Sequence, residues 1–176
     1  MQLKGKTALV TGSTSGIGLA MAKAMAKQGA NVMMNGFGDK DAAMAEVKAY
    51  GVEVDYHGAD MSKPAEIAQM ITACEQRFGS IDVLINNAGL ALGRDAFQDA
   101  NLDDWETMID TNVKGLLYVS KAVLPLLIHN KKAHIINIGS TAGVEVYKEG
   151  NVYCASKHAV AAISKSMRID LLPQHI

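Results

Sequence analysis

Apolar residues along the chain alternate between two patterns. Five short apolar runs have the length and continuous hydrophobicity of parallel strands buried on both faces, at residues 7–10, 31–35, 52–56, 81–85 and 134–138. Between and after them, apolar positions recur at helical spacing at residues 19–28, 39–50, 62–78, 103–130 and 152–172. This alternation predicts an α/β fold with a doubly wound parallel sheet of the Rossmann type. Right-handed crossovers then predict the strand order 3-2-1-4-5.

Residues at the helix ends support these boundaries. Gly29 and Gly51 follow two of the predicted helices, where a glycine commonly terminates a helix. Pro125 lies inside the predicted helix 103–130 and should bend it. The predicted N-terminal caps are Asp39 or Asp41, Ser62 (followed by Pro64), and Asp103 or Asp104.

Composition indicates one soluble globular domain covering residues 1–176, with 49% hydrophobic residues to form its core. The net charge of -1 gives no reason to expect nucleic acid or an anionic membrane as a partner. The apolar stretch 115–128 is interrupted by Lys121 and Pro125 and is too short to span a bilayer. Cys74 and Cys154 have no metal-ligand spacing, so we expect reduced thiols in a cytoplasmic protein and no metal site.

A glycine-rich segment joins the first predicted strand to the first helix. Gly12, Gly16 and Gly18 have the spacing G-x-x-x-G-x-G rather than the commoner G-x-G-x-x-G. Backbone N–H groups and the positive end of a helix attract phosphate at such a place. Three glycines also occur in ordinary tight turns, but their position after a buried strand favours nucleotide binding.

Tyr153 and Lys157 are four residues apart on the last predicted helix and so share one face of it. A phenol beside an ammonium group can exchange a proton with an alcohol or a carbonyl, because the positive charge favours the phenolate. Taken alone, the pair could equally be a packed aromatic residue and a solvated charge. Ser140 and Asn112, earlier in the chain, make the acid–base interpretation the better one.

Together these motifs resemble the short-chain dehydrogenase/reductase family. The resemblance covers nearly the whole chain and rests on T-G-x-x-x-G-I-G at 11–18, N-N-A-G at 86–89, Asn112, Ser140 and Y-x-x-x-K at 153–157. The same motifs occur in the family in this order and at these spacings.

The resemblance implies a role for each motif residue. Tyr153 would be the catalytic acid/base, Lys157 would hold the ribose hydroxyls, Ser140 would bind the substrate oxygen, and Asn112 would keep a water in the proton relay. Without the other motifs, Asn112 would be interpreted as a polar residue on a helix surface. For Asn86 we expect a structural role, with its side chain tying neighbouring strands. Asp60 would meet the adenine. The implied cofactor-binding residues are Gly12, Ser13, Ser15, Gly16, Ile17, Gly18, Phe37, Asp60, Met61, Asn87, Ala88, Gly89, Tyr153 and Lys157.

Two branches of the family are similar to different parts of the chain. Residues 13–19 and 35–39 resemble bacterial 3-hydroxybutyrate dehydrogenases, whereas residues 87–93, 104–112 and 134–143 resemble 3-hydroxy acid (serine) dehydrogenases. The residues that hold the carboxylate in hydroxybutyrate enzymes correspond here to Ala91, Ala142 and Gly150, which argues against hydroxybutyrate itself. Both branches oxidise a hydroxyl beta to a carboxylate, so we expect a small 3-hydroxy acid as substrate. The alternative is a truncated, non-catalytic dinucleotide-binding module.

We expect NAD as the cofactor, with NADP as the alternative. A 2′-phosphate is usually bound by an arginine near the end of the second strand, and residues 35–38 contain no basic residue. Lys40 is the nearest cation, and the usual acidic residue at this strand end is missing too. The preference for NAD should therefore be modest.

The end of the sequence raises two further expectations. Similar family members continue with a sixth strand, a substrate-covering segment and a seventh strand, for which residues 172–176 leave no room. We therefore expect NAD binding with weak or absent turnover, and a fifth strand whose open edge favours association. Small residues on the last helix also predict a homo-oligomer, a dimer or tetramer, through Ala155, Ala159, Ala162 and Ser166.

Overall fold

The computed structural model describes residues 2–130 and 132–176 of the chain. Within that part, five strands form a single sheet in the order β3-β2-β1-β4-β5, as predicted. The strands are β1 (Thr7–Val10), β2 (Asn31–Asn35), β3 (Val54–His57), β4 (Val83–Asn86) and β5 (His134–Asn137). The helices are α1 (Gly16–Lys27), α2 (Lys40–Lys48), α3 (Pro64–Phe78), α4 (Leu102–Ile109), α5 (Leu116–His129) and α6 (Asn151–Asp170).

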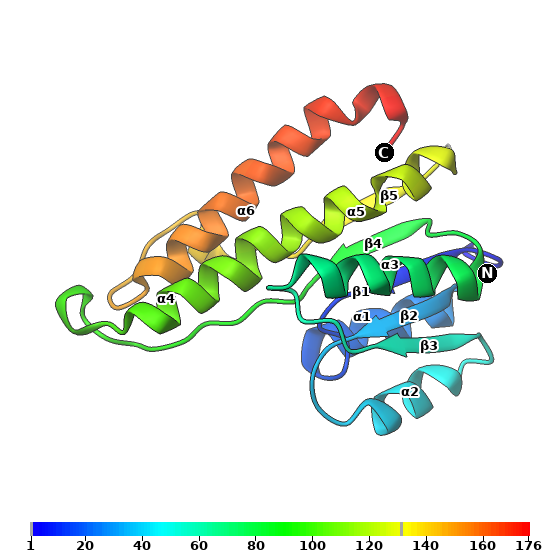
Figure 1. Cartoon of the computed structure of the whole chain (residues 1–176), viewed down its shortest axis with the longest axis horizontal. Helices are drawn as coiled ribbons and strands as arrows, with labels where there is room; N and C mark the ends of the chain where they lie inside the picture. Colours follow the sequence, from blue (N-terminus) through cyan, green and yellow to red (C-terminus); the bar gives the residue numbers. More distant parts are fainter. Residues whose placement is uncertain (1, 131) are drawn as a thin grey trace.

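The sheet lies between two layers of helices, because successive side chains of a strand point to opposite faces. In β1, Ala8 and Val10 face a cluster that includes residues of α1 and α2. Leu9 faces the other cluster, with residues of α3 and α5. Helix α6 lies beside α4 and the π-helical segment Asp110–Gly115 that follows α4, and α4 and the start of α6 extend beyond the strands at one end (Figure 1).

The carboxyl ends of all five parallel strands meet at one edge of the sheet. At that edge the Asn86 amide donates hydrogen bonds of 2.9 Å to Asn137 Oδ1 and to Ser120 Oγ. Asn137 in turn donates to Ser164 Oγ on α6 at 2.9 Å. The prediction that Asn86 ties neighbouring strands is therefore confirmed, and the tie extends to two helices.

Two predicted helix caps are wrong. Asn101 caps α4, accepting from the backbone N–H of Asp103 at 2.9 Å, so neither Asp103 nor Asp104 has that position. Lys63 rather than Ser62 precedes α3, in an extended conformation, because a residue followed by proline avoids helical dihedrals. The Ser62 hydroxyl donates instead to Asp60 Oδ1 at 2.7 Å.

The predicted helix 103–130 is present, but it has an irregular centre. A π-helical segment, Asp110–Gly115, joins α4 to α5, and Pro125 lies inside α5. The combined segment Leu102–His129 is long and apolar enough to cross a membrane by length and composition. Its residues Val119, Val123 and Leu127 are buried in the core cluster on the α3 side of the sheet. This segment therefore packs as a core helix of the domain.

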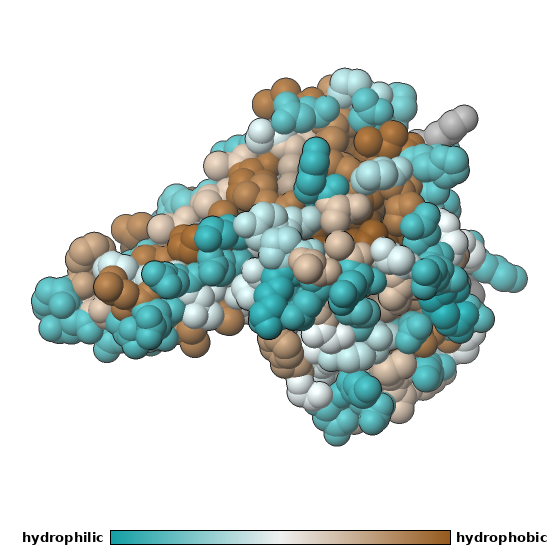
Figure 2. Space-filling view, viewed as in Figure 1, coloured by the Kyte–Doolittle hydropathy of each residue, from teal (hydrophilic) through white to brown (hydrophobic). Residues whose placement is uncertain are grey.

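In the described part of the chain, β5 pairs only with β4, so its other edge is open. Ile136 on β5 is 41% exposed, and apolar residues remain exposed on α6 and after it, including Ile169 and Leu172. A groove of about 400 Å³ runs between β5 and α6. Figure 2 shows apolar surface in the upper part of the view, over α5 and the α6 side. The predicted open edge of the fifth strand is thus observed.

Candidate dinucleotide-binding and active site

The glycine-rich segment places an open helix N-terminus at the carboxyl edge of the sheet. Helix α1 begins at Gly16, and its N-cap residue Ser15 makes no side-chain capping bond. The N–H groups of Gly16, Ile17 and Gly18 have no acceptor among the described residues. Ser15, Gly16 and Ile17 are exposed. Unpaired N–H groups at the positive end of a helix form a site suited to phosphate.

This loop is closely packed against the N-N-A-G segment. Asn87 Nδ2 donates to the carbonyl oxygens of Thr11 at 3.0 Å and Gly12 at 2.9 Å. A Cβ on Gly18 would collide with the Gly12 carbonyl oxygen and lie 2.5 Å from Asn87 Nδ2. Ala88 and Gly89 follow at the same edge, and Gly89 is exposed. The predicted residues Gly12, Gly18 and Asn87 therefore form one packed unit.

Asn35, which was not among the predicted site residues, connects this loop to two strands. Its Oδ1 accepts from the N–H of Gly12 at 3.3 Å, and its Nδ2 donates to the carbonyls of His57 at 2.9 Å and Ala59 at 2.8 Å. Ser13 is fully buried, and its hydroxyl donates to Val10 O at 2.8 Å. Ser13 therefore supports the loop from beneath. A polar residue at the end of a buried strand was the sequence signal for Asn35.

The end of β2 is shaped by two further contacts that the sequence did not predict. The Thr14 hydroxyl donates to the carbonyl oxygen of Phe37, and a Cβ on Gly36 would lie 2.8 Å from Thr14 Oγ1. Tyr56 Oη donates to Gly36 O at 2.6 Å, and Lys40 Nζ lies 5.5 Å from the centre of the Tyr56 ring. Phe37 is 72% exposed beside this junction.

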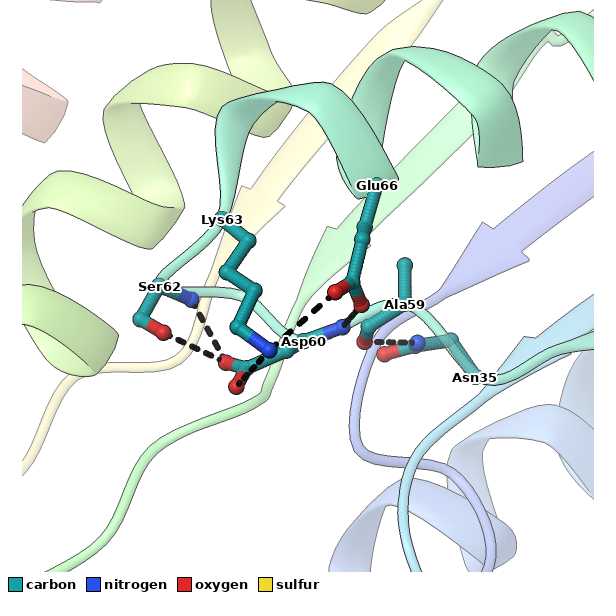
Figure 3. A network of polar contacts seen from close by, with 6 residues as sticks. All are labelled: Asn35, Ala59, Asp60, Ser62, Lys63 and Glu66. Atoms are coloured by element: carbon teal, nitrogen blue, oxygen red, sulfur yellow. Dashed lines mark hydrogen bonds and ion pairs between the residues drawn. The ribbon is translucent and has the colours of Figure 1, made fainter.

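Asp60 belongs to a polar network after β3, drawn in Figure 3. Its Oδ1 accepts from the backbone N–H and the hydroxyl of Ser62, at 2.8 and 2.7 Å, and its own N–H donates to Glu66 at 2.9 Å. The hydrogen bond from the Ser62 backbone N–H is the main cause that lowers the pKa of Asp60. The carboxylate is held ionised and in place, while Met61 beside it is buried in the core. The adenine contact stays a prediction.

Tyr153 and Lys157 lie on α6, one turn apart, as predicted. Lys157 is only 7% exposed, and its Nζ donates to the carbonyl oxygen of Ile138 at 3.0 Å. Burial lowers the pKa of Lys157, because a charged ammonium is less well solvated there. Tyr153 is half-buried and borders a cavity of about 280 Å³.

Ser140 lies just beyond the carboxyl end of β5 and begins a short 3₁₀ turn, Thr141–Gly143. Its Oγ accepts from the N–H of Ala142 at 3.1 Å. A Cβ on Gly143 would lie 2.6 Å from the carbonyl oxygen of Lys157. This close approach seats the serine turn on the part of α6 that carries Tyr153 and Lys157.

Asn112 is buried in the π-helical segment and is not a polar residue on a helix surface. Its Oδ1 accepts from the N–H of Leu90, and its Nδ2 donates to the Leu90 carbonyl, both at 2.8 Å. Nδ2 also donates to Ser156 Oγ at 3.1 Å, on the residue before Lys157. Asn112 thus joins the segment after N-N-A-G to the helix with Tyr153. Its part in a water relay stays a prediction.

Other polar and aromatic residues near the site have structural contacts. Trp105 stacks on Phe97 with ring centres 5.0 Å apart, and its Nε1 donates to Asn151 Oδ1 at 3.1 Å. Trp105 therefore joins α4 to the start of α6 and to the segment before α4. His158 Nδ1 lies 2.9 Å from the carbonyl oxygen of Cys154 in the preceding turn. In the described residues, no group of His, Cys, Asp and Glu side chains could hold a metal ion.

Comparison with known proteins decides the family. The family described as short chain dehydrogenase matches residues 6–176. The chain belongs to this family. D-beta-hydroxybutyrate dehydrogenase of Cupriavidus necator is 45% identical over 170 residues, which are 96% of this chain and 66% of that enzyme. NADP-dependent 3-hydroxy acid dehydrogenase YdfG of Escherichia coli K12 is 42% identical over 164 residues, 93% of this chain and 65% of that enzyme. The chain spans about two thirds of the length of these curated relatives.

Solved structures agree with this assignment. NAD+-bound xylitol dehydrogenase superposes with a TM-score of 0.96 at 31% identity, covering 100% of this chain and 68% of that one. The closed form of serine dehydrogenase complexed with NADP+ has a TM-score of 0.85 at 42% identity, covering 94% and 66%. Both branches expected from the sequence, hydroxybutyrate and 3-hydroxy acid dehydrogenases, thus occur among the relatives.

The small-residue face of α6 is partly open. Ala155, Ala162 and Ser166 are exposed, and Ala159 is half-buried. On neighbouring α5, Leu117 is 40% exposed. The helix therefore does not use this face to pack against its own sheet, although self-association through it stays a prediction.

The contact between Gly18 and Gly12 predicts that an alanine at position 18 destabilises the protein more than an alanine at position 139. Gly18→Ala should lower the free energy of unfolding by at least about 2 kcal/mol and weaken cofactor binding, because the loop must separate from Asn87. Gly139→Ala is the matched control, since a Cβ there meets nothing within 4 Å. It should change stability by less than about 1 kcal/mol in urea unfolding. Equal losses in the two variants would contradict this packing.

The lowered pKa of Lys157 predicts a pH dependence of stability. Between that lowered pKa and the ordinary value of 10.5, the unfolded chain binds more protons than the folded chain, so stability rises with pH. As the pH approaches 10.5, the free energy of unfolding of the wild type should therefore rise relative to that of Lys157→Met. The rise should be about 1.4 kcal/mol for each unit by which the pKa of Lys157 lies below 10.5. Urea unfolding at pH 7 to 10.5 measures the difference. Parallel curves for the two proteins would show that Lys157 is not desolvated.

Proposed function

We propose that this protein is an NAD(P)-dependent oxidoreductase that transfers a hydride between the cofactor and the hydroxyl or keto group of a small 3-hydroxy acid. The observation that carries the proposal is the placement of Ser140, Tyr153, Lys157 and Asn112. Hydrogen bonds and one close backbone contact hold these four residues around the carboxyl end of β5 and the first turns of α6. The family and the relatives named for 3-hydroxy acids support the substrate class.

The residues at the sheet edge fit a dinucleotide. The unpaired N–H groups at Gly16–Gly18 suit a pyrophosphate, and glycine at position 18 lets the loop pack without a side chain in the way. Asp60, whose pKa is lowered, would accept a hydrogen bond from an adenine amino group, and Ala88 and Gly89 would line the cofactor. When bound, the nicotinamide ring supplies the hydride acceptor or donor.

The chain's own residues manage the proton and the orientation of the substrate. During oxidation, Tyr153 takes the proton of the substrate hydroxyl, the C–H bond at the same carbon breaks with its electron pair, and the C–O bond becomes a carbonyl. Ser140 donates a hydrogen bond to that oxygen throughout. The ammonium of Lys157 donates to the carbonyl oxygen of Ile138 and would add the ribose hydroxyls of the cofactor to that contact. Reduction follows the same steps in reverse.

A second candidate function is a dinucleotide-binding module without turnover. The open edge of β5 and the exposed groove beside α6 favour it, because water reaches the part of the sheet next to Ser140. We favour the enzyme, since buried Lys157 and Asn112 impose a desolvation cost that a binding module would not need.

Replacing Tyr153 by phenylalanine tests the proposed chemistry. The ring remains and the acidic hydroxyl is lost, so kcat should fall by about 100- to 10,000-fold while cofactor affinity stays within a few-fold. Tyr147→Phe is the matched control, because Tyr147 borders the same cavity, and it should keep its kcat. Steady-state oxidation of 3-hydroxy acids, followed by nicotinamide absorbance, gives kcat. A phenylalanine variant with most of its activity would refute the assignment.

We further propose that NAD binds more tightly than NADP, by a modest factor. Gly36 leaves no side chain at the end of β2 that would pair with a 2′-phosphate, and Lys40, the nearest cation, lies against the Tyr56 ring. Fluorescence titration should give a lower Kd for NADH than for NADPH, and Lys40→Met should leave the NADH value unchanged. Tighter NADPH binding that disappears in Lys40→Met would reverse this preference and assign the 2′-phosphate contact to Lys40.

A further inference from the structure

A 3-hydroxy acid brings a carboxylate next to the hydroxyl that reacts, so the protein needs a cation close to Tyr153. The cavity of about 280 Å³ bordered by Tyr153 has one basic residue in its lining, Arg94. Arg94 lies on the segment between β4 and α4, whereas Tyr153 lies on the first turn of α6. No motif in the sequence singles it out, because a lone arginine in a loop follows no pattern.

The backbone on both sides of Arg94 is held in place. The N–H of Leu92 points to Met108 Sδ at 3.5 Å, and the carbonyl oxygen of Asp95 accepts from Asn151 Nδ2 at 3.3 Å. Asn151 is the first residue of α6, two residues before Tyr153. The guanidinium therefore extends from a loop that is tied to the helix carrying the catalytic tyrosine, which is how a rigid scaffold positions a binding group.

The charges around the cavity leave Arg94 available. Arg94 has no carboxylate within 4.0 Å among the described residues. Glu149, the acidic residue of the lining, is paired with Lys148 at 3.6 Å. Asp95 and Asp104 direct their carboxylates towards Gly93 instead.

Glu149 also has an unusual backbone. Its φ of 64° lies in the left-handed region, which residues with a side chain seldom adopt. Residues held in such conformations cluster at ligand sites. This loop therefore adds a segment of fixed shape to the lining that Arg94 shares.

We propose that Arg94 determines specificity for carboxylate substrates by forming a bidentate ion pair with the carboxylate of the 3-hydroxy acid. The planar guanidinium presents two parallel N–H groups that match the two oxygens of a carboxylate. The cavity is smaller than pockets that take drug-sized ligands, which are roughly 300–1,000 Å³, so it suits a small acid. This inference rests on the proposed function and adds the group that recognises the acid.

The experiment compares Arg94→Leu with the wild type on 3-hydroxypropanoate, a small 3-hydroxy acid without another charged group, and on its uncharged methyl ester. Arg94→Leu should raise the KM of the acid by about 10- to 100-fold, because a hydrogen-bonded charge pair is lost. It should leave the KM of the ester and the kcat of both substrates within a few-fold. Arg94→Lys should recover part of the loss, since it keeps the charge without the planar fork.

Two further variants serve as controls. Arg168→Leu removes an exposed arginine far along α6 and should leave both substrates unaffected. Glu149→Gln should lower the KM of the acid by a few-fold and leave the ester unchanged, because it removes a negative charge from the lining. Cofactor titration and circular dichroism confirm that each variant is folded.

The outcomes separate this inference from the proposed function. A lower KM for the acid than for the ester in the wild type, with this difference lost in Arg94→Leu, supports the inference. A preference that is the same in wild type and Arg94→Leu overturns it and leaves the oxidoreductase in place. Absence of any oxidation of acid or ester by the wild type overturns the proposed function, and the role of Arg94 with it.

Discussion

The close approach of two backbone segments at the carboxyl edge of the sheet is the contact on which the rest of the site depends. The Asn87 amide binds the carbonyls of Thr11 and Gly12, and Gly18 leaves the space in which they meet. A side chain at position 18 would separate the segments that follow β1 and β4. Helix α1 begins in this packed loop, and its first N–H groups have no acceptor among the described residues, so the same packing positions the proposed phosphate site.

A second set of contacts places the acid–base residues relative to this edge. Helix α6 is held by Asn112 through Ser156, by the Lys157 contact with Ile138, and by the Gly143 turn that follows Ser140. The Asn112 contact joins two buried side chains, and the other two contacts involve main-chain carbonyl oxygens. Hydrogen bonds are strong in such buried places and unpaired groups there are costly. Burial of the Lys157 ammonium group costs stability, because a charged group is less well solvated there.

The α6 side of the molecule contrasts with this closely packed edge. The open edge of β5 and the groove beside α6 expose apolar groups that the core clusters elsewhere enclose. The small-residue face of α6 adds to this exposed surface. The two properties meet at Ser140, which is fixed by its own turn but lies next to the open side of the sheet.

The sequence by itself determined the strand order, the positions of the glycine loop and N-N-A-G, and the pairing of Tyr153 with Lys157. Local patterns encode these features, because apolar runs, glycine spacing and helical periodicity depend on neighbouring residues. Only the tertiary structure decided that Asn112 is buried, that Asn35 and Thr14 hold the loop, and that Arg94 lines the cavity of Tyr153. From the sequence, Asn112 could have been a surface residue. The residues near it in the chain indicate neither the π-helical segment nor the hydrogen bond to Ser156. Arg94 and Tyr153 are far apart in sequence, and their meeting depends on how the loop after β4 packs against the start of α6.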